Sequence, residues 1–498
     1  MLTNKSWIKR IAAFMLLSLI AVPMLAACST SGDADNETTR VLRIATTYGD
    51  DRNSHIRSEF TDLFEYANRN IEIEIVSAYN YNDYYYYGRT GDEEEPDPIE
   101  ELKKMMEGPN PPDIVMLGFE EMPAFIEENM LQPLDPKIQE SNFSVDGFAE
   151  AVIGGIRDLG NGTLYGLAPT FSSYALIYNI DLFANAGIPM PYDGMTWDEV
   201  FDLASRFAGQ GTESEPIFGF AFTDQMYSDF FYDMNIYTAP LGLKMFDDEA
   251  ERMLVNSPQW EQVWSTMMRL YEEGIIPSEE DWQKMRENRD PSRPYSPFDY
   301  NTFLSGRVAM TLMHHSNLDQ IINANRNKDS IEGFDGINWD VVTLPFHPEH
   351  PNVGGNVSMH PIFAINANAQ NPDDAWEFIK FVNGEEWAKL KSRSSYSLVS
   401  RVQYNEPRGG VDYNIEAFFK TKPAVESMMS TDIYRRFPNI WEVQSIGQRK
   451  FYEVMQGNLT VKEALEQWEN EGNQALQRMR ENPDGGGGGV QVLPMPAG

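Results

Sequence analysis

The stretch YALIYNIDLFANAG, residues 174 to 187, contains the signals of a strand, a turn and a helix in immediate succession. Residues 174 to 179 are rich in apolar and aromatic side chains, which favours a strand. Asn179–Ile180–Asp181 can turn the chain, and the short helix that follows ends at Gly187, a residue that terminates helices readily. This part of the chain therefore predicts a strand that leads directly into a helix.

Upstream of this stretch, strands and helices alternate along the chain. Helices whose apolar residues recur near a 3.6-residue period follow the first and second expected strands. This order predicts a parallel sheet with right-handed crossovers, in which ligands bind beyond the carboxyl ends of the strands. Tyr48 to Asp51 and Gly118 to Glu120 should therefore lie at one rim. The expected strands are residues 41–47, 71–76 and 113–117.

Downstream, helices are predicted from their first residues. Thr196 to Glu199 and Thr460 to Glu463 both match a capping box, in which Thr and Glu bond to each other's backbone N–H groups. Asn371 should cap a helix that has Pro372 at its first position. Residues 260–271 carry an apolar helical face. We find no internal repeat, so the chain is predicted to be an α/β protein without repeated units.

The composition excludes several classes of protein. The chain has 498 residues, with 39 Lys and Arg against 76 Asp and Glu, which gives a net charge of −37. A surface this acidic repels phosphate backbones, so we expect no nucleic-acid partner. A hydrophobic fraction of 42% provides for a large core. The single Cys excludes a disulfide framework and every multi-cysteine metal site.

The N-terminus is typical of an export signal. Lys5, Lys9 and Arg10 precede an uncharged apolar stretch at residues 11–27. The stretch ends in Leu25–Ala26–Ala27–Cys28, which resembles the lipobox of bacterial lipoproteins. That resemblance implies cleavage before Cys28, a lipid on its sulfur, and a membrane anchor facing the extracellular or periplasmic side. The alternative is an ordinary secretory signal followed by an incidental Cys.

The two ends of the chain flank the expected folded body. Residues 1–27 are predicted to be a lipoprotein signal peptide, and residues 28–39 a flexible polar tether. Residues 482–498, rich in Gly and Pro, are predicted to be a disordered tail. The folded body should run from about Arg40 to Glu481.

Motifs for catalysis are missing from the sequence. We find no G-x-S-x-G elbow, P-loop, H-E-x-x-H, C-x-x-C or EF-hand loop. His347 and His350 flank Pro348, which disfavours a helical pair of metal ligands. With so many carboxylates, some Asp or Glu pair will always resemble a glycosidase dyad. The sequence therefore favours a binding protein over an enzyme, with no cofactor and no bound metal.

Four segments together resemble the family 1 extracellular solute-binding proteins, the sugar receptors of ABC importers. The resemblance depends on their order and spacing, because none is decisive alone, and we expect their residues to hold the fold rather than contact ligand. The segments are PDIV at 112–115; YGLAP, ALIYN, DLF, AGI and TWDE within 165–199; FLSGRVAM at 303–310; and AWEFIKF at 375–381, followed by GNLTVKEAL at 457–465.

This resemblance implies a two-lobed α/β, periplasmic-binding-protein-like fold that closes on its ligand by a hinge. The first lobe would comprise residues 40–170 plus 350–368, and the second residues 171–349 plus 369–481. The chain would cross between lobes near residues 168–173 and 345–352. The implied partners are a carbohydrate and the membrane-embedded subunits of an ABC permease, and we expect a monomer.

The resemblance and the predicted rim together nominate ligand-binding residues. Sugars present C–H faces and hydroxyl rims, so their sites combine flat aromatic rings with planar polar groups. The candidates are Tyr48, Asp50, Asp51, Phe119 and Glu120 from the first lobe; Phe171, Ser172 and Tyr174 at the first crossing; Phe230, Phe231, His314 and His315 from the second lobe; Asn356 in the return loop; and Trp441 near the end.

Each candidate has a structural alternative. Phe119 and Phe171 could belong to the core, and Asp50 could cap the next helix. At most one of the adjacent Phe230 and Phe231 should face ligand. The family commonly has a Trp in the cleft after the FLSGRVAM segment, where this chain has Met313 to Asn317 instead. The Tyr-rich residues 79–87 are expected to pack on their own lobe, with an aromatic platform beside the cleft as the alternative.

The leading hypothesis is a lipid-anchored receptor that captures an oligosaccharide between its lobes and passes it to an ABC permease without bond chemistry. One alternative is a carbohydrate-active hydrolase with paired carboxylates. The other is the same fold binding a peptide, a polyamine or a glycerol-phosphate compound. The high negative charge disfavours anionic ligands at long range.

Overall fold

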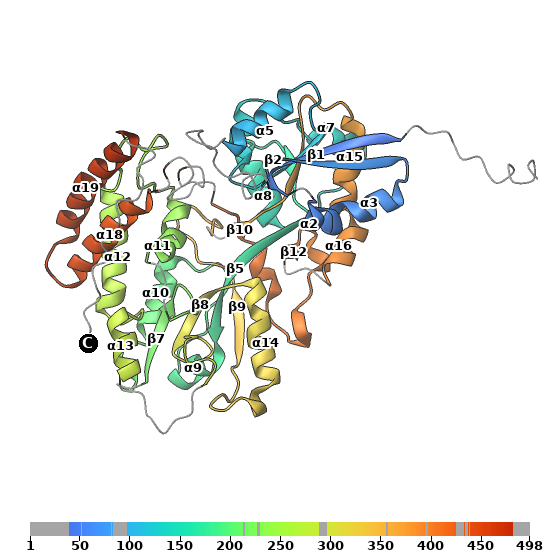
Figure 1. Cartoon of the computed structure of the whole chain (residues 1–498). Coiled ribbons are helices and arrows are strands. Elements are labelled where there is room, and N and C mark those ends of the chain that lie inside the picture. The colour runs from blue at the N-terminus through green and yellow to red at the C-terminus, as the bar shows by residue number, and fades with distance from the viewer. Residues whose placement is uncertain are drawn as a thin grey trace, which may run out of the picture.

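The computed structural model of the chain contains two β-sheets and two large hydrophobic clusters, one of which includes the first sheet together with one face of the second. Figure 1 shows the two sheets in two lobes that meet near the middle of the molecule. The structure describes residues 39–50, 52–80, 82, 97–212, 215–226, 230–287, 296–354, 357–393, 397–424, 433, 437 and 439–481, with only the backbone of 230–232.

The sheet of the first lobe has the strand order β2-β1-β3-β11-β4. Strand β1 is parallel to both β2 and β3, which confirms the parallel sheet predicted from residues 41–117. Strand β11 comes from much later in the chain and lies antiparallel between β3 and β4. The strands are β1 (Arg40–Gly49), β2 (Ile71–Asn80), β3 (Ile114–Leu117), β4 (Gly166–Leu167) and β11 (Ile362–Ile365).

Helices cover this sheet because each buries one apolar stripe. In α5, Leu102 and Met106 are buried, and the Asp97 carboxylate caps the helix by accepting the Ile99 N–H at 2.9 Å. The helical segments of this lobe are α2 (Ser54–Ile56), η1 (Arg57–Thr61), α3 (Asp62–Ala67), α5 (Pro98–Glu107), α6 (Met122–Glu127), α7 (Asp135–Glu140), α8 (Glu150–Leu159), α15 (Pro372–Val382) and α16 (Glu385–Lys391).

Helices α15 and α16 differ from the expected arrangement, which placed residues 369–481 largely on the second lobe. Phe378 of α15 contacts Phe64 and Phe363 edge-on, with ring centroids 5.2 and 5.3 Å apart. Trp387 of α16 stacks on Phe60 at 5.9 Å. The apolar faces of both helices are therefore buried in the core of the first lobe.

Asn371 precedes α15, as predicted, but its side chain makes no capping hydrogen bond. Its amide Nδ2 donates instead to the Val41 carbonyl oxygen at 3.3 Å and to the Asp113 carboxylate at 3.4 Å. The capping prediction is wrong for this residue, because Asn371 joins the start of α15 to strand β1.

The second sheet has the order β10-β5-β8-β7-β6, and β9 and β12 also pair with β5. The strands are β5 (Thr170–Asn179), β6 (Gln210–Gly211), β7 (Pro216–Ala221), β8 (Val308–His314), β9 (Trp339–Val342), β10 (Val357–Ser358) and β12 (Leu398–Val399). The helical segments are α9 (Ile180–Ala186), α10 (Trp197–Ser205), α11 (Phe230–Thr238), η2 (Ala239–Leu241), α12 (Pro258–Glu272), α13 (Glu279–Glu287), η3 (His315–Asn317), α14 (Leu318–Arg326), η4 (Lys328–Ser330), η5 (Val402–Tyr404), η6 (Arg408–Gly410), η7 (Ile415–Phe418), α18 (Trp441–Met455) and α19 (Val461–Glu481).

The local structures that the sequence predicts for this lobe are present. Strand β5 leads directly into α9, which ends at Gly187 in the left-handed conformation. In the first capping box, the Thr196 hydroxyl accepts the Glu199 N–H at 3.2 Å, and Glu199 accepts the Thr196 N–H at 2.8 Å. Thr460 and Glu463 make the same reciprocal pair. These bonds fix the first turns of α10 and α19.

The late segment 398–424 contacts both lobes. Its first strand, β12, pairs with β5 at Thr170 and Phe171. Arg408 then forms an ion pair of 3.2 Å with Asp319 of α14 in the second lobe. Lys422 pairs at 3.1 Å with Asp158 of α8 in the first lobe. The lobes are therefore linked by this segment in addition to the two expected crossings.

Among the helices that the structure describes, none is both long enough and apolar enough to cross a bilayer.

Candidate ligand-binding site

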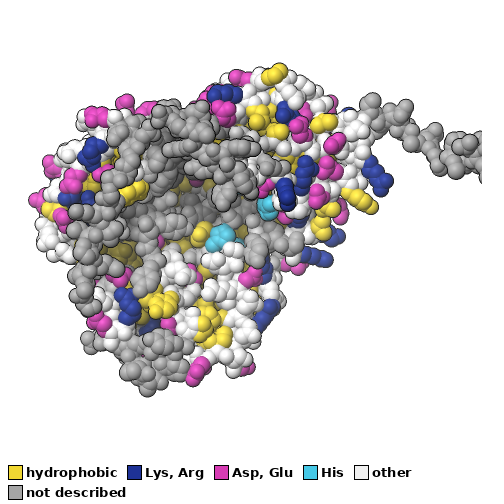
Figure 2. Space-filling view, viewed as in Figure 1, with side chains coloured by type: hydrophobic (Ala, Val, Ile, Leu, Met, Phe, Trp, Pro, Cys, Tyr) yellow, Lys and Arg dark blue, Asp and Glu magenta, His cyan; other side chains and the backbone are white. Residues whose placement is uncertain are grey.

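Figure 2 shows that the surface is hollowed between the two lobes. The ends of β1 and β3 lie side by side in the first lobe, because these strands are parallel neighbours with Thr46 opposite Met116. The predicted rim, Tyr48 to Asp51 and Gly118 to Glu120, therefore lies at the ends of two adjacent strands, with residue 51 outside the described residues. Side chains at these strand ends are the first-lobe candidates for contact with a ligand.

Tyr48 is an accessible aromatic side chain at the end of β1. It is 39% exposed, and its ring meets that of Tyr79 on β2 edge-on at 5.9 Å. Tyr79 begins the Tyr-rich stretch, and its contact with Tyr48 fits packing of that stretch on its own lobe. Residues 81 and 83–87 of the stretch lie outside the described residues.

Asp50 forms the turn after β1. Its Oδ1 accepts the backbone N–H groups of Arg52 at 2.8 Å and Asn53 at 2.6 Å. These bonds order the turn before α2, but they do not cap the helix as the structural alternative for Asp50 expected, because the N-cap residue of α2 is Asn53 and no side chain caps it. Asp51 lies outside the described residues.

The loop after β3 contains one buried candidate and one exposed polar candidate. Phe119 is only 7% exposed and belongs to the core of the first lobe, whereas Glu120 is exposed. The next carboxylate, Glu121, accepts the Gly118 N–H through Oε2 at 2.6 Å. A Cβ placed on Gly118 would lie 3.6 Å from the ring of the exposed His360. Glu121 and His360 therefore meet at Gly118.

Sequence reasoning missed both of these residues. His360 comes from the return segment, more than two hundred positions after Gly118, and no pattern in one sequence indicates such a pairing. Glu121 had a local signal, because an acidic residue three positions after Gly118 can reach back to its N–H group.

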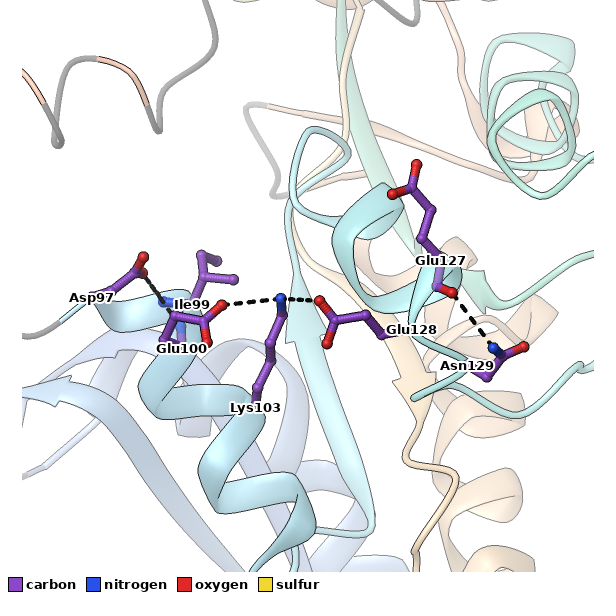
Figure 3. Close-up of polar contacts among 7 residues, drawn as sticks. All are labelled: Asp97, Ile99, Glu100, Lys103, Glu127, Glu128 and Asn129. Atoms are coloured by element: carbon purple, nitrogen blue, oxygen red, sulfur yellow. Dashed lines mark hydrogen bonds and ion pairs between the residues drawn. The ribbon is translucent and has the colours of Figure 1, made fainter. Parts of the chain in front are cut away.

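Figure 3 shows how α5 is joined to the end of α6, the helix that follows the loop after β3. Lys103 of α5 lies between two carboxylates, with Nζ 3.1 Å from Glu100 and 2.5 Å from Glu128 at the end of α6. Burial alone would lower the pKa of Lys103, but the hydrogen bonds to Glu128 and Glu100 outweigh it and raise the pKa. This charged contact joins α5 to the helix that follows the rim.

The candidates at the first crossing are divided between core and surface. Phe171, on β5, is 2% exposed and lies in the hydrophobic cluster that includes residues of both sheets. Ser172 and Tyr174 are half-buried, and Ser172 pairs through its backbone with Ser358 of β10. The Tyr174 ring meets His314 of β8 edge-on at 5.0 Å, since the two residues are opposite each other in the sheet. Tyr174 and His314 therefore form an aromatic pair in the second lobe.

The environment of His314 fixes its protonation. Its Nδ1 accepts the Ser316 N–H at 3.3 Å and lies 2.6 Å from the Ser316 hydroxyl. Burial, helped by the nearby positive charge of Arg408, lowers the pKa of His314. The ring is therefore neutral near pH 7, with its proton on Nε2, and it can donate one hydrogen bond.

His315 points away from this pair. It is 2% exposed, and its ring contacts Phe418 edge-on at 5.0 Å. Side chains of successive residues leave an extended chain on opposite sides, so His314 and His315 could not both reach one site. The structure places His315 in the interior, as it does Phe119 and Phe171.

The remaining candidates come from other parts of the second lobe. Trp441 begins α18 and is 44% exposed, so its ring is accessible. Phe230 and Phe231 open α11, and their side chains lie outside the described part of the chain, as does all of Asn356. In the described ranges, no three His, Cys, Asp or Glu side chains are grouped to bind a metal.

Comparisons with known proteins agree with this architecture. The family model for bacterial extracellular solute-binding proteins matches residues 51–389, more than half of the chain. A sugar transporter from Rhizobium etli in an open conformation is 17% identical, with a TM-score of 0.56 over 87% of this chain and 99% of its own. The sugar-binding protein MalE from Xanthomonas citri is 16% identical, with a TM-score of 0.55 over 90% and 100%.

A cyclo/maltodextrin-binding protein, solved in complex with maltotetraose, is 17% identical and has a TM-score of 0.51 over 91% of this chain and 100% of its own. At these identities the three structures share the fold. The match to the family model begins just after β1 and ends within helix α16, so it includes strands of both sheets. The chain therefore belongs to the bacterial extracellular solute-binding proteins of ABC transporters.

Proposed function

We propose that the protein captures a carbohydrate, and specifically an oligosaccharide, in the hollow between its lobes and delivers it to an ABC permease. The observation that carries this proposal is the pairing of aromatic rings with hydrogen-bonding groups. Tyr48 is close in the chain to the Asp50 turn, and Tyr174 contacts a neutral His314 whose Nδ1 accepts the Ser316 N–H. Such pairs suit sugars, which present apolar faces edged by hydroxyl groups.

The proteins of similar fold support the same class of ligand. The MalE protein is described as sugar-binding, and the maltodextrin-binding protein was solved with a chain of glucose units. A hinge that closes on its ligand needs no catalytic group, only contacts that are better in the closed state. The crossings through β5 and residues 398–424 are the segments on which we expect the lobes to turn.

The ligand class is tested by a thermal-shift screen of residues 29–498 against oligosaccharides, monosaccharides, peptides and polyamines. Ligand at a hundred times its Kd should add about 2.7 kcal/mol of stability. A shift confined to one glycan series would support the proposal. A shift with peptides or amines alone would show that the ligand is not a carbohydrate. Release of glycan products would favour the hydrolase alternative.

Once the screen has identified a ligand, Trp441→Ala should weaken its binding by about 1–3 kcal/mol, because a stacking aromatic ring contributes about this much. The matched control is Tyr452→Ala on the same helix, which removes a ring that is 57% exposed. Titration calorimetry should detect weaker binding in the first variant only. Equal affinities would remove Trp441 from the site.

We also propose that the protein is held to the membrane by a lipid on Cys28, outside the described residues. The support is the apolar stretch at 11–27 and the lipobox-like sequence that ends in the only Cys of the chain. Cys28→Ala should move the protein from the membrane fraction to the medium or periplasm. Retention of this variant in the membrane fraction would contradict lipid anchoring.

A further inference from the structure

The late segment 398–424 runs from the first lobe to the second and back to the first. Near its start, the Ser400 carbonyl oxygen accepts the Ala149 N–H, just before α8, at 2.7 Å. In its middle, the Asn414 N–H donates to the carboxylate of Asp340, on strand β9 of the second sheet, at 2.9 Å. One stretch of chain thus holds both lobes, and we call it the strap.

The strap returns to helix α8 of the first lobe. The Ala151 N–H donates to the Phe419 carbonyl oxygen at 3.2 Å. The Lys422 ammonium lies 3.1 Å from the carboxylate of Asp158, which is also on α8. Residues 419–422 are therefore fixed to the first lobe at both ends.

The same end of the strap pairs with the chain that leads from β9 back to the first sheet. The Lys422 N–H donates to the Asn352 carbonyl oxygen at 2.8 Å, and the Gly354 N–H donates to the Lys422 carbonyl oxygen at 3.0 Å. A Cβ placed on Gly354 would lie only 2.3 Å from the Thr421 side chain, so glycine permits this close approach. Since β12 at the other end pairs with β5, the strap is bonded to both connections between the lobes.

Lys420 belongs to the stretch that is fixed to the first lobe, but its side chain reaches the second. Its Nζ lies 3.0 Å from the carboxylate of Asp193, in the loop after α9. Asp193 is itself held in place, because its Oδ1 accepts the Thr343 N–H and the Asn414 side-chain amide, each at 3.0 Å. Lys420 and Asp193 therefore form an ion pair that spans the two lobes.

A second carboxylate makes this ion pair easy to break. The Lys420 Nζ also lies 3.0 Å from Glu416, four residues earlier in the strap, so the ammonium stays paired if Asp193 moves away. The side chains of Lys420 and Asp193 are 43% and 34% exposed, so water can solvate the released carboxylate. Ion pairs with this much exposure contribute little free energy, which suits a contact that forms and breaks.

We propose that the Lys420–Asp193 ion pair is a latch that holds the lobes in the hollowed arrangement of Figure 2 and opens when they close. Closure by a hinge moves Asp193 relative to residues 419–422, because the two belong to different lobes. Loss of the latch should therefore shift the ligand-free protein toward closed arrangements. This inference rests on the proposed closure of the lobes around a solute, and it is independent of the class of that solute.

The test measures the distance between the lobes without any ligand. Removal of Cys28 leaves a cysteine-free chain, and Glu107→Cys on α5 and Tyr452→Cys on α18 then carry two spin labels at exposed positions. Pulsed dipolar electron paramagnetic resonance gives the distribution of distances between the labels. Lys420→Met is compared with Lys420→Arg, which keeps the charge, and with Lys284→Met, which removes a lysine paired within α13.

Lys420→Met should enlarge the population with short interlobe distances about two- to fivefold, whereas Lys420→Arg and Lys284→Met should keep the parent distribution. Sodium chloride at about 1 M reduces the Debye length to about 3 Å. It should shift the parent protein in the same direction and have a smaller effect on Lys420→Met.

Unchanged or longer distances in Lys420→Met would overturn the proposal, as would an equal response to salt in this variant and in the parent protein. An unchanged melting temperature will show that the exposed substitution leaves the fold intact. Because no ligand is used, a failure of carbohydrate binding is detected separately, in the thermal-shift screen.

Discussion

The two lobes have different cores. In the first lobe, the centre of the sheet is aliphatic, with Leu42, Ile44 and Val115 fully buried. In the second lobe, the four largest fully buried side chains of the described chain are all tryptophans, namely Trp197, Trp260, Trp264 and Trp468. The second core is therefore centred on tryptophan rings, whereas the centre of the first sheet is aliphatic and aromatic rings of α3, α15 and α16 pack around it.

Aromatic rings join distant parts of the chain in both lobes. In the first lobe, Phe378 of α15 contacts Phe64 of α3, about three hundred residues earlier in the sequence. The second lobe must join α12 to α19, which lie about two hundred residues apart in the sequence. Large rings bury much area per residue and reach across the gap between two helices. We therefore expect single substitutions to cost most where rings join distant helices.

The largest expected effect is that of Trp468→Ala. Its ring is fully buried, stacks on Trp264 at 5.3 Å and meets Trp260 edge-on at 5.8 Å. Its Nε1–H donates to the Val443 carbonyl oxygen at 2.8 Å. The variant should lose about 3–5 kcal/mol of unfolding free energy. Urea unfolding and calorimetry would measure the loss.

Calorimetry also tests whether the lobes are separate units of stability. If the lobes unfold separately, Leu42→Ala should lower the melting temperature of one calorimetric transition, and Trp468→Ala should lower that of another. If both variants shift one single transition equally, the two cores form one cooperative unit and the contrast drawn above fails. Trp441→Ala, which removes an exposed ring, is the control and should leave stability nearly unchanged.

The second-largest expected effect is a dependence of the unfolding free energy on pH, caused by His347. This residue is 6% exposed, and its Nε2 lies 2.7 Å from the Tyr237 carbonyl oxygen. Burial lowers the pKa of His347 in the folded protein, whereas the unfolded chain should have the ordinary value near 6.5. The stability contributed by the neutral ring is therefore complete above about pH 6.5 and is lost as the pH falls toward the folded pKa.

The slope from this one group is at most about 1.4 kcal/mol per pH unit below 6.5. His347→Gln should flatten the fall in unfolding free energy between neutral and mildly acidic pH. The control is His55→Gln in the first lobe, where the side chain is exposed. An unchanged pH profile in His347→Gln would show that the fall comes from other groups, such as His314, whose pKa burial also lowers.

The smallest expected effect compares helix caps in the two lobes. Asp97 caps α5 in the first lobe, and Thr196 caps α10 in the second. Asp97→Ala and Thr196→Ala should each cost about 1 kcal/mol, since each leaves an N-terminal N–H group without its acceptor. Similar losses of unfolding free energy in the two variants would show that the lobes differ in their cores and not in their helix caps. A much larger loss in Thr196→Ala would show that its capping box also supports the neighbouring crossing.

Local signals in the sequence predicted local structure well. The parallel strands β1, β2 and β3, the β5–α9 unit and the capping boxes at Thr196 and Thr460 are confirmed, because each depends on residues close together in the chain. The position of α15 was not predictable in this way. Its apolar face fits either core, and only the distant pairing of β11 with β3 brings α15 to the first lobe.

The candidate site was predicted in outline rather than in detail. The sequence indicated the rim at the ends of β1 and β3, but it could not tell that Phe119 and His315 turn inward. It also could not bring His360 to Gly118, because that contact depends on the whole path of the chain. The ligand-contacting roles of Tyr48, Tyr174 and Trp441 remain predictions.

The position of β11 has a consequence for synthesis on the ribosome. Strand β3 has β1 on one side, but its other edge is open until residues 362–365 have been made. The Trp264 ring likewise lacks its Trp468 partner until α19 is translated. Neither lobe can complete its core early, so the nascent chain stays incompletely folded for most of its translation. A chain that finishes folding late remains open to threading through an export channel.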